Sequence, residues 1–446
     1  MSRTPLWAIF PFLSDLLLIA LVPMFFGRFW ESNRNKLIVA LLVSSPVLVF
    51  LLASPQGGQL LGRTTCDYLS FMALLAALFT ISGGISLNGS LVGSPFVNTA
   101  FLAAGSVLGS LVGTTGASVL LIRPLLRANE RRAYVTHVVV FFIFIVSNGA
   151  GLLTPLGDPP LFLGFLRGVP FGWTLRLAPQ WALVNGALLA IFFVIDQVQF
   201  ARERRRPPVR RATTPRPVPP EALGPLRLEG VLNVAWLAGI VALVFLMGSY
   251  GERYLGDGYL RAAVQVGGTL AFAALSFRTT AARVHEVNRF SWGPIVEVAA
   301  VFVGVFVTMV PAMSFLAERG PTLGITKPWQ FFWASGALSS VLDNAPTYLT
   351  FASLATGVAG SASGTVLSPD NLGALAAHPI GRELLTAVSC GAVFMGAVTY
   401  MGNGPNFMVK AIAEQHRVRM PSFFGYMLWS FAILVPLFGI VSYIFF

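Results

Sequence analysis

The stretch "SNGAGLLTPLGDPP", residues 147–160, interrupts a segment that otherwise has the composition of a membrane-spanning helix. The apolar run "YVTHVVVFFIFIV" precedes it and "LFLGFL" follows it. Three glycines, three prolines, one Asn and one Asp stand where a simple transmembrane helix would carry apolar residues. The meaning of this interruption depends on whether the rest of the chain is built for a membrane.

Composition indicates a membrane protein. The chain of 446 residues is 55% hydrophobic and only 11% charged, with a mean hydropathy of +0.73. A helix of about 20 apolar residues crosses a bilayer, and nearly uncharged windows of that length recur along the chain. They cover residues 6–27, 37–53, 68–89, 176–195, 230–247, 259–277, 292–312 and 423–446. We therefore predict an all-α, polytopic, integral membrane protein, with the first window retained as a helix rather than removed as a signal peptide.

The net charge of +12 is concentrated near the middle of the chain. Between residues 201 and 227 lie eight arginines and seven prolines, a composition that does not pack a core and is typical of an extended linker. The positive-inside rule places such a segment in the cytoplasm, where it can also attract anionic lipid headgroups. This placement argues against nucleic acid as a partner. It divides the chain into a repeat at 1–200, a linker at 201–228 and a second repeat at 229–446.

The two halves have the same order of segments. Each has three apolar windows, a segment with a polar centre, an interrupted apolar segment and a final window. The polar-centred segments are 98–122 and 329–355, and the interrupted ones are 134–166 and 384–410. If the polar-centred segments are re-entrant hairpins, each half crosses the membrane five times, so the halves are inverted repeats. Secondary transporters of this plan place interrupted helices and their substrate site near the membrane midplane.

The distribution of basic residues fits this topology. With the linker inside, 21 of the 30 Lys and Arg residues fall in inside loops, at 28–36, 123–132, 201–227, 278–289 and 410–419. Both termini are then outside, and we expect the membrane to be a bacterial cytoplasmic membrane.

The interruption at 147–160 has a chemical explanation. Unwound backbone at membrane depth leaves polar groups unpaired, so it persists only where protein, water or a bound ion satisfies them. Glycines permit the unwinding, prolines prevent the helix from closing, and Asn148, Thr154 and Asp158 add side-chain oxygens. A counterpart, "TYMGNGPNF" at 399–407, supplies Asn403 and Asn406. Two breaks in corresponding positions indicate a site between the halves.

The predicted hairpin tips carry further candidate ligands. The first tip lies in "GTTGASVLLIRPLL" at 113–126 and the second in "SSVLDNAPTYLTFASLA" at 339–355. The candidates are Thr114, Thr115 and Ser118 in the first, and Asp343, Asn344 and Thr347 in the second. A carboxylate inside a membrane is costly and by default functional, as an ion ligand or a proton carrier.

These four regions resemble the signature regions of the ion-transporter superfamily. That superfamily groups bacterial sodium/proton antiporters, arsenite-pump membrane subunits, citrate-metal symporters and divalent-anion sodium symporters. The resemblance in layout covers nearly the whole chain, and the specific motifs cover about 50 residues. It implies that the first hairpin and first break form one half of a site and the second hairpin and second break form the other. The Ser-Asn-Thr tip typical of dicarboxylate symporters is absent here.

The charges of the predicted site favour a cation as cargo. Asp158 and Asp343 are candidate sodium ligands from opposite halves, and no Lys, Arg or His lies in either break or tip. Oxygen ligands suit a hard cation, and desolvation favours protonation of a carboxylate, so Na⁺ and H⁺ can compete. We therefore expect a sodium/proton antiporter. The alternative is a cation-coupled transporter of citrate or another organic anion.

Other classes of function find little support in the sequence. No catalytic triad, Walker loop, zinc spacing or Rossmann fingerprint is present, so we expect neither an enzyme nor a resident cofactor. The expected partners are membrane lipids and the transported ion, and a homodimer is compatible with the sequence.

The topology makes the first prediction. A cysteine introduced at Thr213 should react with a membrane-impermeant thiol reagent only from the cytoplasm, and one at Ser363 only from outside. Labelling of both positions from one face would contradict the inverted-repeat arrangement.

Overall fold

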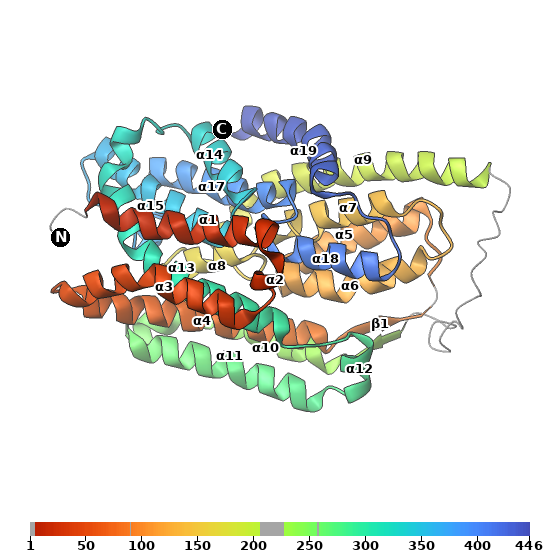
Figure 1. Cartoon of the computed structure of the whole chain (residues 1–446), viewed down its shortest axis with the longest axis horizontal. Coiled ribbons are helices and arrows are strands. Elements are labelled where there is room, and N and C mark those ends of the chain that lie inside the picture. Colours follow the sequence, from red (N-terminus) through yellow and green to blue (C-terminus); the bar gives the residue numbers. More distant parts are fainter. Residues whose placement is uncertain (1–4, 90, 206–226, 257) are drawn as a thin grey trace.

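The structure is a computed structural model that describes residues 5–89, 91–205, 227–256 and 258–446 (Figure 1). The first half begins with η1 (Leu6–Ile9), α1 (Phe10–Phe25), α2 (Gly27–Trp30), α3 (Asn33–Ala53), α4 (Gly57–Gly83) and the short strand β1 (Ser86–Asn88). It continues with α5 (Pro95–Val112), α6 (Thr114–Ala128), α7 (Thr136–Ile145), η2 (Gly149–Leu152), α8 (Pro159–Leu166), η3 (Phe171–Leu177) and α9 (Ala178–Arg204).

The second half follows a similar order. It begins with β2 (Arg227–Glu229), α10 (Leu232–Leu255), α11 (Tyr259–Thr279), α12 (Ala282–Val287), α13 (Gly293–Arg319) and η5 (Gly320–Leu323). It continues with α14 (Pro328–Ser339), α15 (Asn344–Ser363), α16 (Leu372–Ala377), α17 (Pro379–Met395), η6 (Gly396–Val398), α18 (Gly404–Gln415) and α19 (Phe423–Phe445). The predicted all-α fold class is confirmed.

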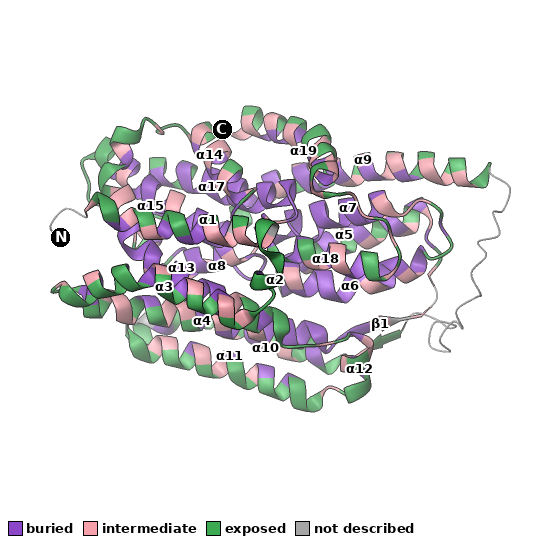
Figure 2. Cartoon of the chain, in the orientation of Figure 1, coloured by how far each residue is buried: buried purple, intermediate pink, exposed green. Residues whose placement is uncertain are grey.

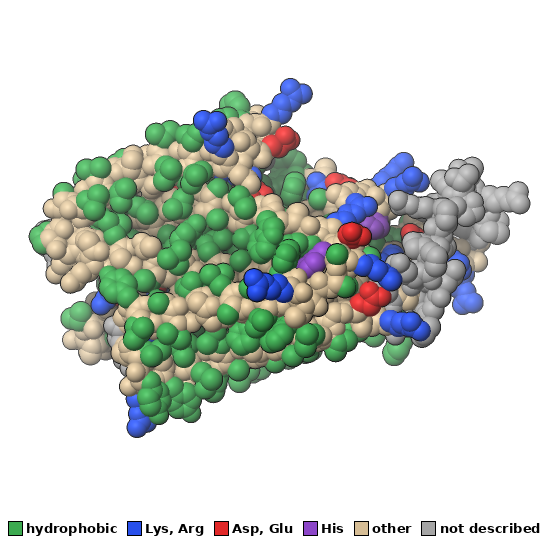
Figure 3. Space-filling view, turned by 90° about the horizontal axis from the view of Figure 1, so that it is seen from below, with side chains coloured by type: hydrophobic (Ala, Val, Ile, Leu, Met, Phe, Trp, Pro, Cys, Tyr) green, Lys and Arg blue, Asp and Glu red, His purple; other side chains and the backbone are tan. Residues whose placement is uncertain are grey.

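The helices are built for a membrane. Within the described residues, ten helices are long and apolar enough to cross a bilayer. Many residues of the peripheral helices α3, α10 and α11 are exposed, whereas almost all of α7 and most of α17 are buried (Figure 2). Hydrophobic side chains cover the body of the molecule, and charged ones gather toward the end where α12 lies (Figure 3). An exposed apolar surface of this extent is stable only in lipid, so the chain is an integral membrane protein.

The two halves are interleaved. Helix α3 packs along α13, and α4 packs along α11, so each contact joins the first half to the second. Strands β1 and β2 pair antiparallel, with Ser86 opposite Glu229. The halves therefore share one core.

The first polar-centred segment folds back on itself at Gly113, whose φ of 81° suits glycine. At the open end of this α5–α6 hairpin, the Gly93 N–H donates to the Ala128 carbonyl oxygen at 2.8 Å. Asn98 and Asn129 exchange two side-chain hydrogen bonds of 3.0 and 2.8 Å. The two arms are thus joined at the base, and the turn lies at the far end.

The second polar-centred segment forms the α14–α15 hairpin. Its turn, residues 340–343, ends at Asp343, whose carboxylate accepts a hydrogen bond from the Ala345 N–H at 3.0 Å and caps α15. Helix α14 lies so close to α17 that a Cβ on Gly391 would be 2.4 Å from the Phe332 carbonyl oxygen.

Both predicted interruptions are present. The first separates α7 from α8, and the second separates α17 from α18. The inversion of the halves, the repeat boundaries and the sides of the termini stay predictions. Most of the predicted linker, including Thr213, lies outside the described residues, as do residues 1–4.

A buried ionic cluster fixes the base of the first hairpin. Asp196 of α9 is fully buried, and its carboxylate lies 2.6 Å from Arg132 Nη1 and 2.8 Å from His137 Nε2. It also accepts a 2.9 Å hydrogen bond from Asn98 of α5. Helix α9, the α6–α7 connection and the hairpin are therefore held by one carboxylate.

This cluster makes the second prediction. Asp196→Ala leaves Arg132 buried without that partner, so we expect a loss of about 3–5 kcal/mol of stability, measured as a lower thermal midpoint of the purified protein. Glu414→Gln is the control, because Glu414 pairs with Lys410 at 3.8 Å on the surface, where such pairs contribute about 0–1 kcal/mol. An equal effect of the two substitutions would contradict the role of the cluster.

Candidate functional site

The candidate site is centred on Asp158, in the first break. Its side chain is 1% exposed, and the backbone at Asp158 forms the N-cap of α8. Three further helices begin at the same carboxylate. It accepts a hydrogen bond from a residue at the start of each of them, namely the first residue of α6, the first residue of α15 and the N-cap residue of α18. These donors are Thr114, Asn344 and Asn403. Both hairpins and both interrupted helices therefore meet at one side chain.

The donors to Asp158 are neutral. Thr114 Oγ1 donates to Oδ1 at 2.9 Å, Asn403 Nδ2 lies 3.4 Å from Oδ1, and Asn344 Nδ2 donates to Oδ2. No Lys, Arg or His in the described part of the chain forms a salt bridge with this carboxylate. A buried carboxylate with only neutral partners favours a bound cation or a proton.

Three asparagines join the two breaks. Asn148 Nδ2 donates to Asn406 Oδ1 at 2.7 Å, and Asn403 Nδ2 lies 3.1 Å from the Ser147 carbonyl oxygen. Asn406 in turn donates to the carbonyl oxygens of Gly396 and Thr399. The three predicted asparagines thus mainly satisfy unwound backbone and connect the halves.

A threonine in each break binds the neighbouring hairpin. Thr154 Oγ1 donates to the Ser110 carbonyl oxygen, and Thr399 Oγ1 donates to the Ser340 carbonyl oxygen at 2.5 Å. Thr399 was missed in the sequence analysis. The signal was available, because "TPLGD" at 154–158 and "TYMGN" at 399–403 share a Thr-x-x-Gly-Asp/Asn pattern.

The other predicted residues occupy more peripheral positions. Ser118 Oγ lies 2.8 Å from Ser147 Oγ, which ties α6 to the first break and adds Ser147 to the site. Thr115 is half-buried and lines the cavity described below. Thr347 donates to the Asp343 carbonyl oxygen at 3.0 Å, within its own helix.

Asp343 lies close to the centre without a hydrogen bond to Asp158. Its carboxylate is directed at the start of α15, where it accepts the Ala345 N–H. The structure therefore gives the two aspartates different surroundings, one shared by four helices and one capping a single helix. Their role as sodium ligands stays a prediction.

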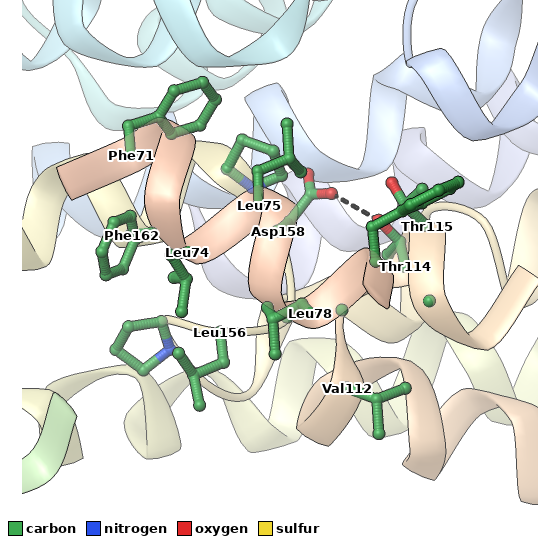
Figure 4. Close-up of a pocket in the computed structure, with 16 residues that line it drawn as sticks. Phe71, Leu74, Leu75, Leu78, Val112, Thr114, Thr115, Leu156, Asp158 and Phe162 are labelled. Carbon is green, nitrogen blue, oxygen red and sulfur yellow. Dashed lines mark hydrogen bonds between the residues drawn. The ribbon is translucent and has the colours of Figure 1, made fainter. Parts of the chain in front are cut away.

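A small cavity adjoins Asp158. Its volume is about 30 Å³, enough for about one water molecule or a bare ion. Thr114, Thr115 and Asp158 lie along one side, and Phe71, Leu74, Leu75 and Leu78 of α4 form an apolar wall opposite (Figure 4).

The oxygens near this cavity suit a hard cation. Asn344 Oδ1 is fully buried and has no hydrogen-bond partner in the described chain. Together with Asp158 and Thr114 it offers carboxylate, amide and hydroxyl oxygens, the ligands that hard cations prefer. These three donors are all oxygens, whereas transition metals are typically bound through His or Cys side chains.

A comparison with protein families identifies the family to which this chain belongs. A family described as "Putative citrate transport" matches residues 1–446. The chain belongs to this family, which lies within the ion-transporter superfamily. No curated protein matches the chain. The protein is therefore a member of a membrane transporter family.

The recurring threonines make the third prediction. Thr154→Val and Thr399→Val each remove a bond between a break and a hairpin, so each should lower the transport rate about tenfold, as expected for a buried hydrogen bond. Thr347→Val is the control, because its hydroxyl bonds only within α15. Transport in proteoliposomes measures the effect, and a Thr399→Val protein as active as wild type would contradict the symmetrical role.

Proposed function

We propose that this protein is a secondary transporter that moves a small carboxylate anion, with citrate as the first candidate, together with a coupling cation. The single observation that carries the proposal is the meeting of four helix N-termini at Asp158. The family membership supports citrate as the anion. We propose transport rather than catalysis, in a bacterial cytoplasmic membrane with both termini outside.

The charge balance explains why a cation is needed. Each helix N-terminus contributes on the order of half a positive charge, so four contribute about two. Asp158 and Asp343 together contribute two negative charges when both are ionised. The site is then close to neutral and gives a free carboxylate anion little attraction. A bound Na⁺, or protonation of Asp158, makes it positive and allows the anion to bind.

This order of binding gives coupling. The cation occupies the oxygens of Asp158, Thr114 and Asn344, and the anion then meets the positive ends of the helix dipoles. Without the cation the anion binds weakly, because the two carboxylates offset the positive charge of the helix ends. Each ligand raises the affinity for the other, as linkage requires.

Sodium/proton exchange is the second candidate, and the size of the central cavity favours it. At about 30 Å³ the cavity accepts an ion but not an organic anion in this conformation. Competition of Na⁺ and H⁺ for Asp158 would be sufficient for exchange.

One experiment separates the two candidates. The purified protein is reconstituted in liposomes with an internal pH dye, and Na⁺, Li⁺, K⁺ or Mg²⁺ is added with or without radiolabelled citrate. Citrate accumulation that requires a cation gradient supports the first candidate. Proton movement on Na⁺ addition without citrate supports the second and would contradict the first if citrate uptake is absent.

The fourth prediction concerns Asp158. Asp158→Asn keeps the size of the side chain but removes its charge, so we expect a folded protein that has lost cation-driven transport in the liposome assay. Asp343→Asn preserves an N-cap residue, so a loss of transport there would report the charge rather than the cap.

Two other intramembrane carboxylates serve as controls. Asp15 and Glu297 lie far from the breaks in the chain, on α1 and α13. Asp15→Asn and Glu297→Gln should retain at least part of the activity. Full activity in an Asp158→Asn, Asp343→Asn double variant would contradict the proposal that the charges of these two carboxylates control ligand binding.

A further inference from the structure

A second and larger cavity lies where the N-terminal ends of α4 and α11 meet the C-terminal end of α8. Its volume is about 380 Å³, within the range of small-molecule sites. Its described lining includes three arginines and two aspartates, which are Arg63, Arg167, Arg261, Asp67 and Asp370. The arginines come from three different elements and converge on one space.

Arg167 is held in place while keeping donors free. It is 7% exposed, and its Nη1 donates to the Pro369 carbonyl oxygen at 3.1 Å. Its guanidinium nitrogens lie 3.5 Å from Asp67 and 3.7 Å from Asp370. Charge-assisted hydrogen bonds are about 2.7–2.9 Å long, so both ion pairs are loose. Most of the five N–H donors of this guanidinium are therefore available to a ligand.

Among the residues that the structure describes, Arg63 and Arg261 form no salt bridge and no side-chain hydrogen bond, although Asp67 is close enough to interact electrostatically with Arg63. They extend from α4 and α11, two helices that pack against each other. With three arginines and two aspartates, the described lining carries a net charge of +1 when all five groups are ionised. The cavity is therefore suited to a negatively charged ligand.

The cavity is adjacent to the central site. Helix α4 lines both, through Ser70 in the larger cavity and Phe71 in the smaller one. Helix α8 begins at Asp158 and ends next to Arg167, nine residues or about 13 Å along a helix. Phe71 of α4 and Phe162 of α8 line the smaller cavity (Figure 4).

We propose that this arginine cavity, lined by Arg63, Arg167 and Arg261, is a binding site for a di- or tricarboxylate anion, separate from the Asp158 site. The choice of carboxylates rests on the proposed function, whereas the preference for an anion rests on the arginines alone. Guanidinium groups bind carboxylates through two parallel N–H···O bonds. Three of them from different directions match a ligand with two or three carboxylates. The anion is thus captured on the way to a central site that is too small to hold it in this conformation.

The fifth prediction tests this cavity by calorimetric titration of the purified full-length protein with citrate, and with inorganic phosphate in a parallel experiment. In Arg63→Gln/Arg261→Gln the Kd for citrate should rise at least about tenfold, because the charge-assisted hydrogen bonds of both guanidinium groups to the anion are lost. Arg63→Lys/Arg261→Lys keeps the positive charges but removes the paired N–H donors of the guanidinium groups, so it should cause a smaller loss of citrate affinity. Arg167 is left unchanged, because it is buried.

The matched control is Arg319→Gln/Arg382→Gln, which removes two exposed arginines that do not line the cavity. Its Kd for citrate in sodium-free buffer should equal that of wild type. An unchanged Kd in Arg63→Gln/Arg261→Gln would overturn the site, as would arginine-dependent binding of phosphate with none of citrate.

The results that would contradict the transport proposal differ from those that would contradict the anion site. If liposomes accumulate no citrate but the purified protein binds it through Arg63 and Arg261, the cavity stands and the transport proposal fails. If citrate is transported while its binding does not depend on these arginines, the transport proposal stands and the proposed anion site in the arginine cavity is wrong.

Discussion

The cost of burying one carboxylate organises this molecule. An aspartate at the centre of a bilayer costs about 2.5–3.5 kcal/mol on insertion scales, and Asp158 is 1% exposed. The chain stabilises it with the starts of four helices, three of which reach it through the neutral side chains Thr114, Asn344 and Asn403. Those helices begin at membrane depth only because two spans are broken and two segments turn back. The interruptions and the hairpins are thus consequences of the same constraint.

The unpaired polar groups of the unwound backbone are the second energetic cost, and the asparagines satisfy most of these groups. Asn148, Asn403 and Asn406 satisfy carbonyl groups that the broken helices leave free, and they bond to one another across the two halves. Away from the centre, Asp196 joins three elements at the base of the first hairpin. Polar side chains therefore hold the inner helices together in a protein whose outer surface is apolar.

The sequence alone predicted the fold class, the two hairpin turns and the two breaks well. Apolar windows of about 20 residues and clusters of Gly and Pro are strong local signals, and they report backbone geometry directly. The roles of individual site residues were harder to predict. Asp158 and Asp343 look alike in sequence, yet one is shared by four helices and the other caps a single helix.

Contacts between distant segments explain what the sequence reasoning missed. Thr399 matters through a carbonyl oxygen 59 residues away, and Ser147 through a serine on another helix. The interleaving of α3 with α13 and α4 with α11 was not foreseen, because hydropathy windows carry no information on which helices become neighbours. The arginine cavity was hidden for the same reason, since its three arginines are scattered among the nine Lys and Arg residues that lie outside the predicted inside loops.

The apolar wall of α4 beside Asp158 has an electrical consequence. An unpaired ion next to Phe71, Leu74 and Leu78 meets a medium that solvates charge poorly, and the penalty for one unpaired charge there is several kcal/mol. That penalty falls steeply when opposite charges travel together. In the proposed transporter, this wall opposes the passage of a single unpaired ion, so the total charge of the bound ligands matters more for transport than the shape of any one ligand.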